Sequence, residues 1–261
     1  MLECPFFVLH YKKNLERKAY LERVLAGCIA PVFIEDLDQG EFPLDQIYCF
    51  DPVLFTRQIM SVHECMIAGT LKQGQLRNWP WTECVRAVRS LNLTTEQTLR
   101  DHPWLGPQPL SPGEVSLVLK HRIAWERIAS QDSDYAIVAE DDVVLFDHSL
   151  AYLSTVLTKL PDDFDYIDLA GGVGLSAVGG DPVINSHFFK IDPPRDRTSC
   201  CAIIRKRFAQ RMLEADPRVV LGSDWMLTYL FNATGAKVYW VEPLVFGHGS
   251  QMQVYRSNLI T

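Results

Sequence analysis

Three consecutive carboxylates end a short apolar segment near the middle of the chain. Residues 135–139 read Tyr-Ala-Ile-Val-Ala, and Glu140, Asp141 and Asp142 follow directly. Two like charges about 4 Å apart repel by roughly 4 kcal/mol at an effective dielectric constant near 20, so an ordered cluster of this kind is best explained by a neutralising cation. Hard divalent cations take oxygen ligands, and the cluster therefore predicts a Mg²⁺ or Mn²⁺ site.

The spacing of the three acids matters as much as their charge. Alternate residues of a strand point to opposite faces, so Glu140 and Asp142 are expected on one side and Asp141 on another. Two acidic residues separated by any single residue form the minimal sequence pattern that holds a metal together with a diphosphate. The alternative is that these acids only cap a following helix or solvate the end of a strand.

Two residues in the second half of the chain are candidates for the same chemistry. Asp224 follows a Gly-Ser pair at the start of a predicted helix, where an acid is either a catalytic base or a stabiliser of the helix N-terminus. His248 lies between two glycines, which permit close approach of the backbone to a phosphate. Its imidazole is a candidate metal ligand or diphosphate contact, and a structural or surface role is the alternative.

Three candidates for nucleotide binding lie elsewhere. Asp36 ends a predicted strand, and open α/β sheets bind ligands at the carboxyl ends of their strands, so it is a candidate contact for base or ribose. Arg195 and Arg197 follow two prolines in a predicted loop, where two guanidinium groups can hold phosphate oxygens in a fork. The alternative for the two arginines is a solvated charge cluster.

Aromatic residues give a weaker indication. His121 and Trp125 are four residues apart on one face of a predicted helix, and we favour packing, with His121 supporting the acidic segment, over a binding surface. Trp79, Trp81 and Trp104 either stack on the sugar rings of a ligand or form the core of an insertion.

The apolar pattern supplies elements that can position these side chains. Residues 5–10 and 30–36 are predicted strands, and residues 13–25 have helical spacing, which together predict a parallel βαβ unit. Ser111, Pro112 and Glu114 predict a capping box at the start of a helix. That helix is expected over 112–131, with further strands at 135–139, 164–169, 188–191, 200–204 and 237–241 and further helices at 150–159, 206–215 and 224–233.

Length and composition bound the class of protein. With 261 residues, 48% of them hydrophobic, the chain is expected to form one α/β domain, 1–261, with an insertion at 38–110. The formal net charge of -7 argues against nucleic acid as a partner. The seven cysteines contain no CxxC pair and are expected to be reduced. No apolar run approaches the roughly 20 residues of a membrane-spanning helix, so we expect a cytoplasmic protein whose membrane contact, if any, is peripheral to the inner face.

Several of these segments resemble glycosyltransferase family 25, which includes bacterial lipooligosaccharide galactosyltransferases and collagen galactosyltransferases. The similarity is carried by residues 110–114, by His121 with Trp125 and Glu126, and by residues 135–143, which contain the acidic cluster. It is looser at residues 7–11, where His10 and Tyr11 replace the more usual Asn-Leu pair, and it continues at 165–169, 201–204 and 224–225. The resemblance implies a GT-A-like nucleotide-sugar-binding fold with a mainly parallel central sheet.

The resemblance also implies a reaction and roles for the candidate residues. The expected reaction is metal-dependent transfer of a hexose, galactose from UDP-galactose, with inversion, to a saccharide acceptor such as a lipooligosaccharide or another surface glycan. Asp142 would bridge the metal and the donor diphosphate, with Glu140 on the ribose or on the metal through water and Asp141 in the donor site. His248 would complete the metal shell, and Asp224 would be the general base.

Two other classes of protein remain as alternatives. One is a non-catalytic sugar-nucleotide or glycan-binding protein of the same fold. The other is a metal-dependent phosphohydrolase or nucleotidyltransferase, although the sequence lacks the Gly- and Lys-rich phosphate loop that such chemistry favours.

Overall fold

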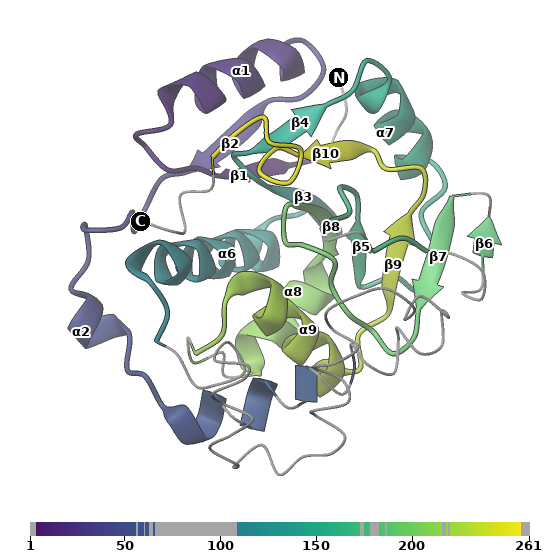
Figure 1. The fold of residues 1–261 in the computed structure, drawn as a ribbon. Helices are drawn as coiled ribbons and strands as arrows, with labels where there is room; N and C mark the ends of the chain where they lie inside the picture. The colour runs from purple at the N-terminus through teal and green to yellow at the C-terminus, as the bar shows by residue number, and fades with distance from the viewer. Residues whose placement is uncertain are drawn as a thin grey trace.

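A central sheet with helices on both faces forms the body of the protein (Figure 1). The structure is a computed structural model that describes residues 4–55, 57–59, 61–62, 65, 109–172, 175–177, 183–185, 187–215, 218 and 220–256. The strand order is β2-β1-β3-β8-β5-β9-β7-β6. The strands are β1 (Phe6–Leu9), β2 (Pro31–Ile34), β3 (Tyr135–Glu140), β5 (Tyr166–Asp168), β6 (Val183–Asn185), β7 (Phe188–Ile191), β8 (Cys201–Arg205) and β9 (Val238–Val241).

The sheet is mixed. β1 pairs in parallel with β2 and with β3, which confirms the predicted βαβ unit. β8 lies antiparallel between β3 and β5, and β7 is antiparallel to both β6 and β9. The prediction of a mainly parallel sheet is therefore wrong for the described strands. A strand buried on both faces is a continuous apolar run whichever way it points, so its sequence does not reveal its direction.

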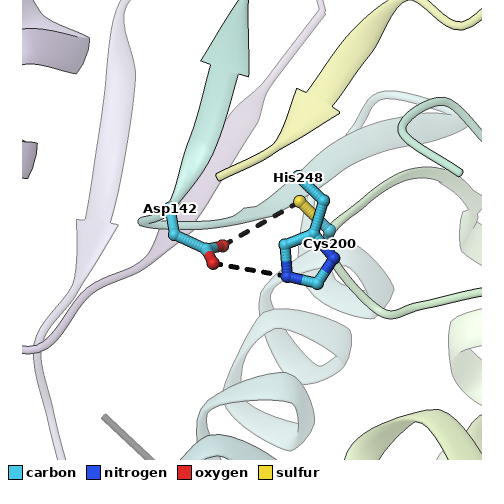
Figure 2. Close-up of side chains that lie close together, drawn as sticks. All are labelled: Asp142, Cys200 and His248. Carbon is cyan, nitrogen blue, oxygen red and sulfur yellow. Dashed lines mark hydrogen bonds and ion pairs between the residues drawn. The ribbon is translucent and has the colours of Figure 1, made fainter. Parts of the chain in front are cut away.

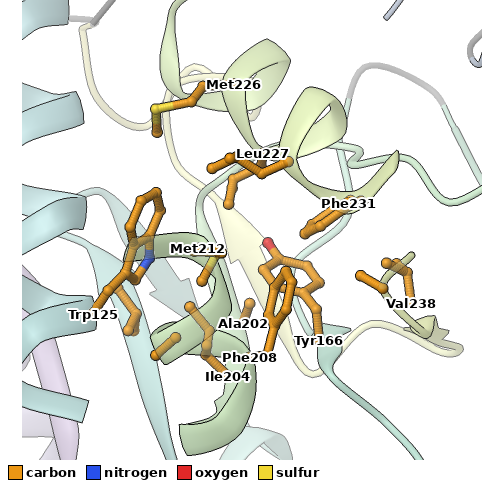
Figure 3. Packing of buried hydrophobic residues seen from close by; sticks show 14 of the residues in the cluster. Trp125, Tyr166, Ala202, Ile204, Phe208, Met212, Met226, Leu227, Phe231 and Val238 are labelled. Atoms are coloured by element: carbon orange, nitrogen blue, oxygen red, sulfur yellow. The ribbon is translucent and has the colours of Figure 1, made fainter. Parts of the chain in front are cut away.

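Three helices cover one face of the sheet: α6 (Pro112–Ser130), α8 (Lys206–Glu214) and α9 (Ser223–Thr234). Their apolar side chains pack against β3 and β8, and Trp125, Phe208 and Phe231 are fully buried there (Figure 3). Full burial of a Phe-sized side chain contributes about 1.5–3 kcal/mol relative to exposure. This layer fixes α6 against the sheet beside the end of β3.

The opposite face is covered by α1 (Leu15–Leu25) and α7 (Ser149–Leu157). Leu21, Leu25, Leu153 and Val156 are fully buried in a second apolar cluster with side chains of β1, β3 and β8. Successive residues of β3 alternate between the two clusters, with Ala136 and Val138 in one and Ile137 and Ala139 in the other. The strand that carries the acidic cluster is thus packed against an apolar cluster on each face of the sheet.

The start of α6 is fixed by its own side chains. The Ser111 hydroxyl accepts from the Glu114 backbone N–H at 3.2 Å, and the Glu114 carboxylate accepts from the Ser111 N–H at 2.7 Å. Pro112 is the first helical residue. The predicted capping box is confirmed, and it holds the N-terminal turn of α6 beside the ends of β1 and β3.

A small second sheet brings the C-terminal segment to the acidic cluster. β4 (Val143–Leu145) pairs antiparallel with β10 (Phe246–His248), and His248 lies opposite Val143. Neither strand is predicted from the sequence, because each has only three residues. Their register places His248 next to the turn that holds Asp142.

The predicted insertion at 38–110 is described only in part. It contains α2 (Leu44–Ile47) and helical residues at 52–55, 57–59 and 61–62. Leu54, Phe55, Ile59 and Val62 are buried and belong to the cluster beneath α6, α8 and α9. Trp79, Trp81 and Trp104 lie outside the described residues, and the single-domain arrangement with this insertion stays a prediction.

Two expectations from composition are met by the described part of the chain. None of its helices combines the length and apolar character that crossing a bilayer requires. Its six cysteines are all free thiols: Cys4, Cys28, Cys49, Cys65, Cys200 and Cys201.

Candidate metal and donor site

A cavity of about 210 Å³ lies at the carboxyl ends of β1 and β3. Five residues predicted from the sequence line it: Glu140, Asp141, Asp142, Asp224 and His248. Residues that were not predicted as site residues line it as well: Arg17, Lys120, Ser199, Ser223 and Ser250. The cavity therefore collects polar groups from both halves of the chain at one edge of the sheet.

Asp141 is held by the N-terminal segment. Its Oδ2 accepts from His10 Nδ1 at 2.9 Å, Tyr11 N at 3.1 Å and Asn14 Nδ2 at 3.0 Å, and its Oδ1 accepts from Arg17 Nη1 at 2.7 Å. Burial opposes its charge, but these hydrogen bonds and the Arg17 charge hold the pKa of Asp141 below its usual range. Both oxygens are occupied, so Asp141 anchors the acidic turn, and we do not assign it to donor binding. His10 is one of its partners.

Asp142 points to the C-terminal segment. Its Oδ2 lies 3.3 Å from His248 Nε2 and accepts from the Ser250 N–H at 3.2 Å and from the Ser250 hydroxyl. Burial raises the pKa of Asp142, but the hydrogen bond and charge of His248 outweigh it and leave the pKa lowered. Burial likewise opposes a charge on His248, but Asp142 raises the pKa of that imidazole. Each of the two side chains therefore favours the charged form of the other.

A glycine makes this approach of the two segments feasible. The Gly249 N–H donates to the Asp142 carbonyl at 2.9 Å. A Cβ on Gly249 would lie 2.4 Å from that carbonyl oxygen and 2.5 Å from the Tyr255 ring. The predicted role of the flanking glycines is close approach to phosphate, whereas Gly249 approaches the acidic turn itself.

Glu140 and Asp224 meet at Ser199. The Ser199 hydroxyl contacts Glu140 Oε1 and lies 2.8 Å from Asp224 Oδ1, which also accepts from the Ser199 N–H at 2.9 Å. A hydroxyl has a single hydrogen, so it can donate to only one of the two carboxylates at a time. Ser199 fixes the spacing between the predicted base and the acidic strand end. The sequence signal for it is weak, since it is only a small polar residue ahead of a buried strand.

His121 lies behind Glu140, in agreement with the expected supporting role. Its Nε2 is 3.7 Å from Glu140 Oε1, and its ring packs against Trp125 with 6.3 Å between centroids. It is 2% exposed, and neither ring nitrogen has a hydrogen-bond partner among the described residues. The buried imidazole thus packs behind the Glu140 carboxylate on the side away from solvent.

A buried ion pair borders the other end of the cavity. Lys120 Nζ contacts Asp38 Oδ1 and the His10 carbonyl, and Asp38 Oδ2 accepts from the Lys12 N–H at 2.9 Å. Asp38 and Lys120 are each 3% exposed. This pair fixes the loop after β2 against α6.

Three predicted nucleotide contacts do not line the cavity. Asp36 is exposed and pairs with Arg127 at 3.3 Å. Arg195 and Arg197 are buried rather than solvated, with their guanidinium carbons 4.9 and 4.6 Å from the Trp240 ring centroid. Arg197 also donates to Asp168 at 2.8 Å and to Glu242 at 2.6 Å. Because the side chains of both arginines face these internal groups, neither the phosphate fork nor the solvated cluster is present.

The residues beside Asp142 fit a divalent cation. Asp142, Cys200 and His248 each present one ligand atom, and these three atoms lie within 4.8 Å of one another. Nδ1 of His248 is buried without a hydrogen-bond partner in the described part of the chain. Carboxylate, imidazole and thiol are all recognised metal ligands. Glu140, predicted as a ligand, is not in this group and contacts Ser199 instead.

Comparison with known proteins defines the class. Residues 83–177 match the model of a family of glycosyltransferases. The family is Glycosyltransferase family 25 (LPS biosynthesis protein), which confirms the resemblance and implies a GT-A-like fold. No curated protein matches the chain. The matched family implies a glycosyltransferase enzyme and gives no support to the phosphohydrolase alternative, whereas a non-catalytic protein of the same fold would match the same model.

The matched segment and the cavity overlap only in part. Residues 83–177 include α6 and the whole acidic cluster. Ser199, Asp224 and His248 lie beyond it, and the fold brings them to the same cavity.

Proposed function

We propose that the protein transfers a hexose, with inversion, from a UDP-sugar to a saccharide acceptor such as a lipooligosaccharide. Galactose is the proposed donor sugar, and a divalent cation, Mn²⁺ or Mg²⁺, is the proposed cofactor. The family match supports sugar transfer and a nucleotide-sugar donor. One observation carries the proposal: Glu140, Asp142, Asp224 and His248 converge on a single cavity at a strand-end edge of the sheet.

Asp142 and His248 are the proposed holders of the metal. They already face each other at 3.3 Å, and both belong to backbone segments joined by the β4–β10 pair. A bound divalent cation supplies Lewis-acid stabilisation of the charge that develops on the leaving diphosphate. Glu140 lies one residue ahead of the turn and is the proposed contact for the donor ribose.

Asp224 is the proposed general base. Its Oδ1 accepts from the Ser199 N–H and lies within hydrogen-bond distance of the Ser199 hydroxyl, while no hydrogen bond to Oδ2 is found among the described residues. An oxygen with this freedom can accept the proton of an acceptor hydroxyl as that hydroxyl attacks the anomeric carbon. Such general-base assistance contributes about 10²–10⁴-fold to the rate.

A ligand screen tests the proposal. Thermal unfolding of the purified protein would be followed with UDP-, GDP- and CMP-sugars, each with and without Mn²⁺. Saturation at a hundredfold excess over Kd stabilises a protein by about 2.7 kcal/mol, which is readily seen as a rise in Tm. We expect UDP-sugars to raise the Tm, and to raise it more in the presence of Mn²⁺. We also expect the protein to release UDP from UDP-galactose when Mn²⁺ is present. No stabilisation by any sugar nucleotide, with or without metal, would contradict the proposal.

A further inference from the structure

We propose that Cys200 is a third protein ligand of the metal, beside Asp142 and His248, and that the site consequently prefers a cation with affinity for sulfur, of the Zn²⁺ or Co²⁺ type, over Mg²⁺. The inference rests on the proposed metal site. It changes the class of cation expected there, because carboxylates alone predict a hard, oxygen-bound ion.

The three side chains lie close enough to approach one ion, and His248 and Cys200 face different oxygens of Asp142. Asp142 Oδ2 lies 3.3 Å from His248 Nε2, and Asp142 Oδ1 lies 3.9 Å from Cys200 Sγ (Figure 2). A tetrahedral shell built from metal–sulfur bonds of about 2.3 Å and metal–nitrogen or metal–oxygen bonds of about 2.0–2.1 Å spaces neighbouring ligand atoms about 3.3–3.6 Å apart. Small side-chain adjustments therefore suffice to bring all three onto one ion.

Backbone hydrogen bonds hold the three segments in place. The Glu140 N–H donates to the Cys200 carbonyl at 2.7 Å, which fixes the start of β8 beside the acidic turn. The Gly249 N–H donates to the Asp142 carbonyl at 2.9 Å, which fixes the segment after His248. Ligands on a rigid backbone lose little conformational freedom when they bind, and this favours a specific site.

The neighbouring carboxylates are engaged elsewhere. Asp141 has both oxygens occupied by His10, Tyr11, Asn14 and Arg17. Glu140 contacts Ser199 and faces His121. Asp142 is the carboxylate that lies beside the imidazole and the thiol, with Oδ2 also accepting from Ser250, and the donor set around it is oxygen, nitrogen and sulfur rather than oxygen alone.

The thiol changes the selectivity of the site. Mg²⁺ demands near-octahedral oxygen coordination, whereas thiol and imidazole ligands favour Zn²⁺ and Co²⁺. When the sulfur–metal bond forms, the S–H bond breaks and its proton leaves to solvent, so binding releases a proton. Buried cysteines ordinarily act as small apolar residues. Cys201, the next residue and equally buried but outside the ligand group, provides that comparison.

Optical titration of the full-length protein with Co²⁺ tests the inference. We expect one equivalent of Co²⁺ to produce a near-ultraviolet sulfur-to-cobalt charge-transfer band in the wild type and in Cys201→Ser. Cys200→Ser should lose the band and bind Co²⁺ more weakly by more than the roughly 10–100-fold that loss of outer-shell support costs. A wild-type complex without the band, or a Cys200→Ser complex that keeps it, would overturn the assignment.

A second measurement covers the case in which Cys200→Ser does not fold. The ¹¹³Cd chemical shift of the wild-type Cd²⁺ complex should lie in the range of a site with one sulfur ligand, and a shift typical of oxygen and nitrogen ligands alone would overturn the inference. If the protein turns over a UDP-sugar with Mn²⁺ but shows neither the charge-transfer band nor the sulfur-type ¹¹³Cd shift, Cys200 is not a metal ligand and the proposed function still holds. Failure to bind any of these metals, with no metal-dependent turnover, would contradict both.

Discussion

Arg17 and Asp141 form a buried ion pair, with 2.7 Å between Nη1 and Oδ1 and side chains that are each 8% exposed. Arg17 also donates through Nη2 to the Arg256 carbonyl at 2.5 Å and lies over the Tyr255 ring. One guanidinium thus joins the acidic turn to the C-terminal segment that carries His248. The geometry of the cavity depends on this contact between the first helix and the last described residues.

Asp141→Asn is expected to destabilise the fold. The change leaves the buried Arg17 charge without its carboxylate, and breaking a buried pair in this way costs about 3–5 kcal/mol. Because the folded-state pKa of Asp141 is lowered, its contribution is present above the unfolded pKa of about 3.9 and is lost as the pH falls through the folded value. Denaturant unfolding should show a large difference from wild type at neutral pH that shrinks in the acid range. Asp36→Asn, at an exposed pair, should change stability by at most about 0.5 kcal/mol.

Asp142→Asn is expected to abolish the effect of metal on donor binding. The amide removes the charge that His248 and a cation both require, so UDP should bind equally well with and without Mn²⁺. Isothermal titration calorimetry would measure this. Asp147→Asn, an exposed acid a few residues further on, is the control and should retain the metal dependence. A metal-dependent affinity that survives in Asp142→Asn would remove this residue from the site.

Asp224→Asn should separate binding from chemistry. Loss of a general base lowers kcat by about 10²–10⁴-fold, while the Kd for the donor should change little because Asp224 is assigned to the acceptor. Single-turnover transfer and donor titration would be compared on the same preparation. Ser199→Ala, which removes the hydroxyl but keeps the N–H bond to Asp224, should lower kcat less. Wild-type turnover in Asp224→Asn would exclude it as the base.

The pairing of His248 with Asp142 predicts a pH dependence in the metal-free protein. The His248 pKa is raised, so its contribution to stability is complete below the unfolded value of about 6.5 and is lost as the pH rises through the folded pKa. The Asp142 pKa is lowered, so its contribution is present above about 3.9 and is lost as the pH falls through the folded pKa. The pair should stabilise most between these limits. NMR titration should show the His248 ring titrating at lower pH in Asp142→Asn than in wild type.

Gly249→Ala is expected to disrupt the site without touching a charged group. The added Cβ would lie 2.4 Å from the Asp142 carbonyl oxygen, so the turn and the segment after His248 must move apart. We expect weaker metal binding and a lower Tm. Gly222→Ala is the matched control, because its Cβ would find no atom nearer than Glu114 Oε1 at 3.9 Å. Equal metal affinity in the two variants would show that the close approach is not needed.

Features encoded within a few residues are predictable from the sequence. The capping box of α6 and the abrupt change from apolar to acidic residues at the end of β3 are both local signals. His248 stands out because of its two glycine neighbours. The structure places all of these where the local pattern indicates.

Features that depend on pairing between distant segments are not predictable in this way. Ser199 and Cys200 reach the acidic turn because β8 runs antiparallel to β3, and an apolar strand does not encode that direction. Asp141 is separated by more than a hundred residues from its partners at positions 10–17, so its occupied oxygens leave no trace in the local sequence. Arg195 and Arg197 follow two prolines like surface residues, yet they are buried because Asp168, Glu242 and Trp240 come from other elements.

The most direct test of the metal and donor site is a crystal structure grown with Mn²⁺ and UDP, with diffraction data collected at a wavelength where manganese scatters anomalously. We expect an anomalous peak within coordination distance of Asp142 and His248, with the UDP diphosphate in contact with it inside the cavity. A peak at another place, or UDP bound away from Glu140 and Asp142, would contradict the account.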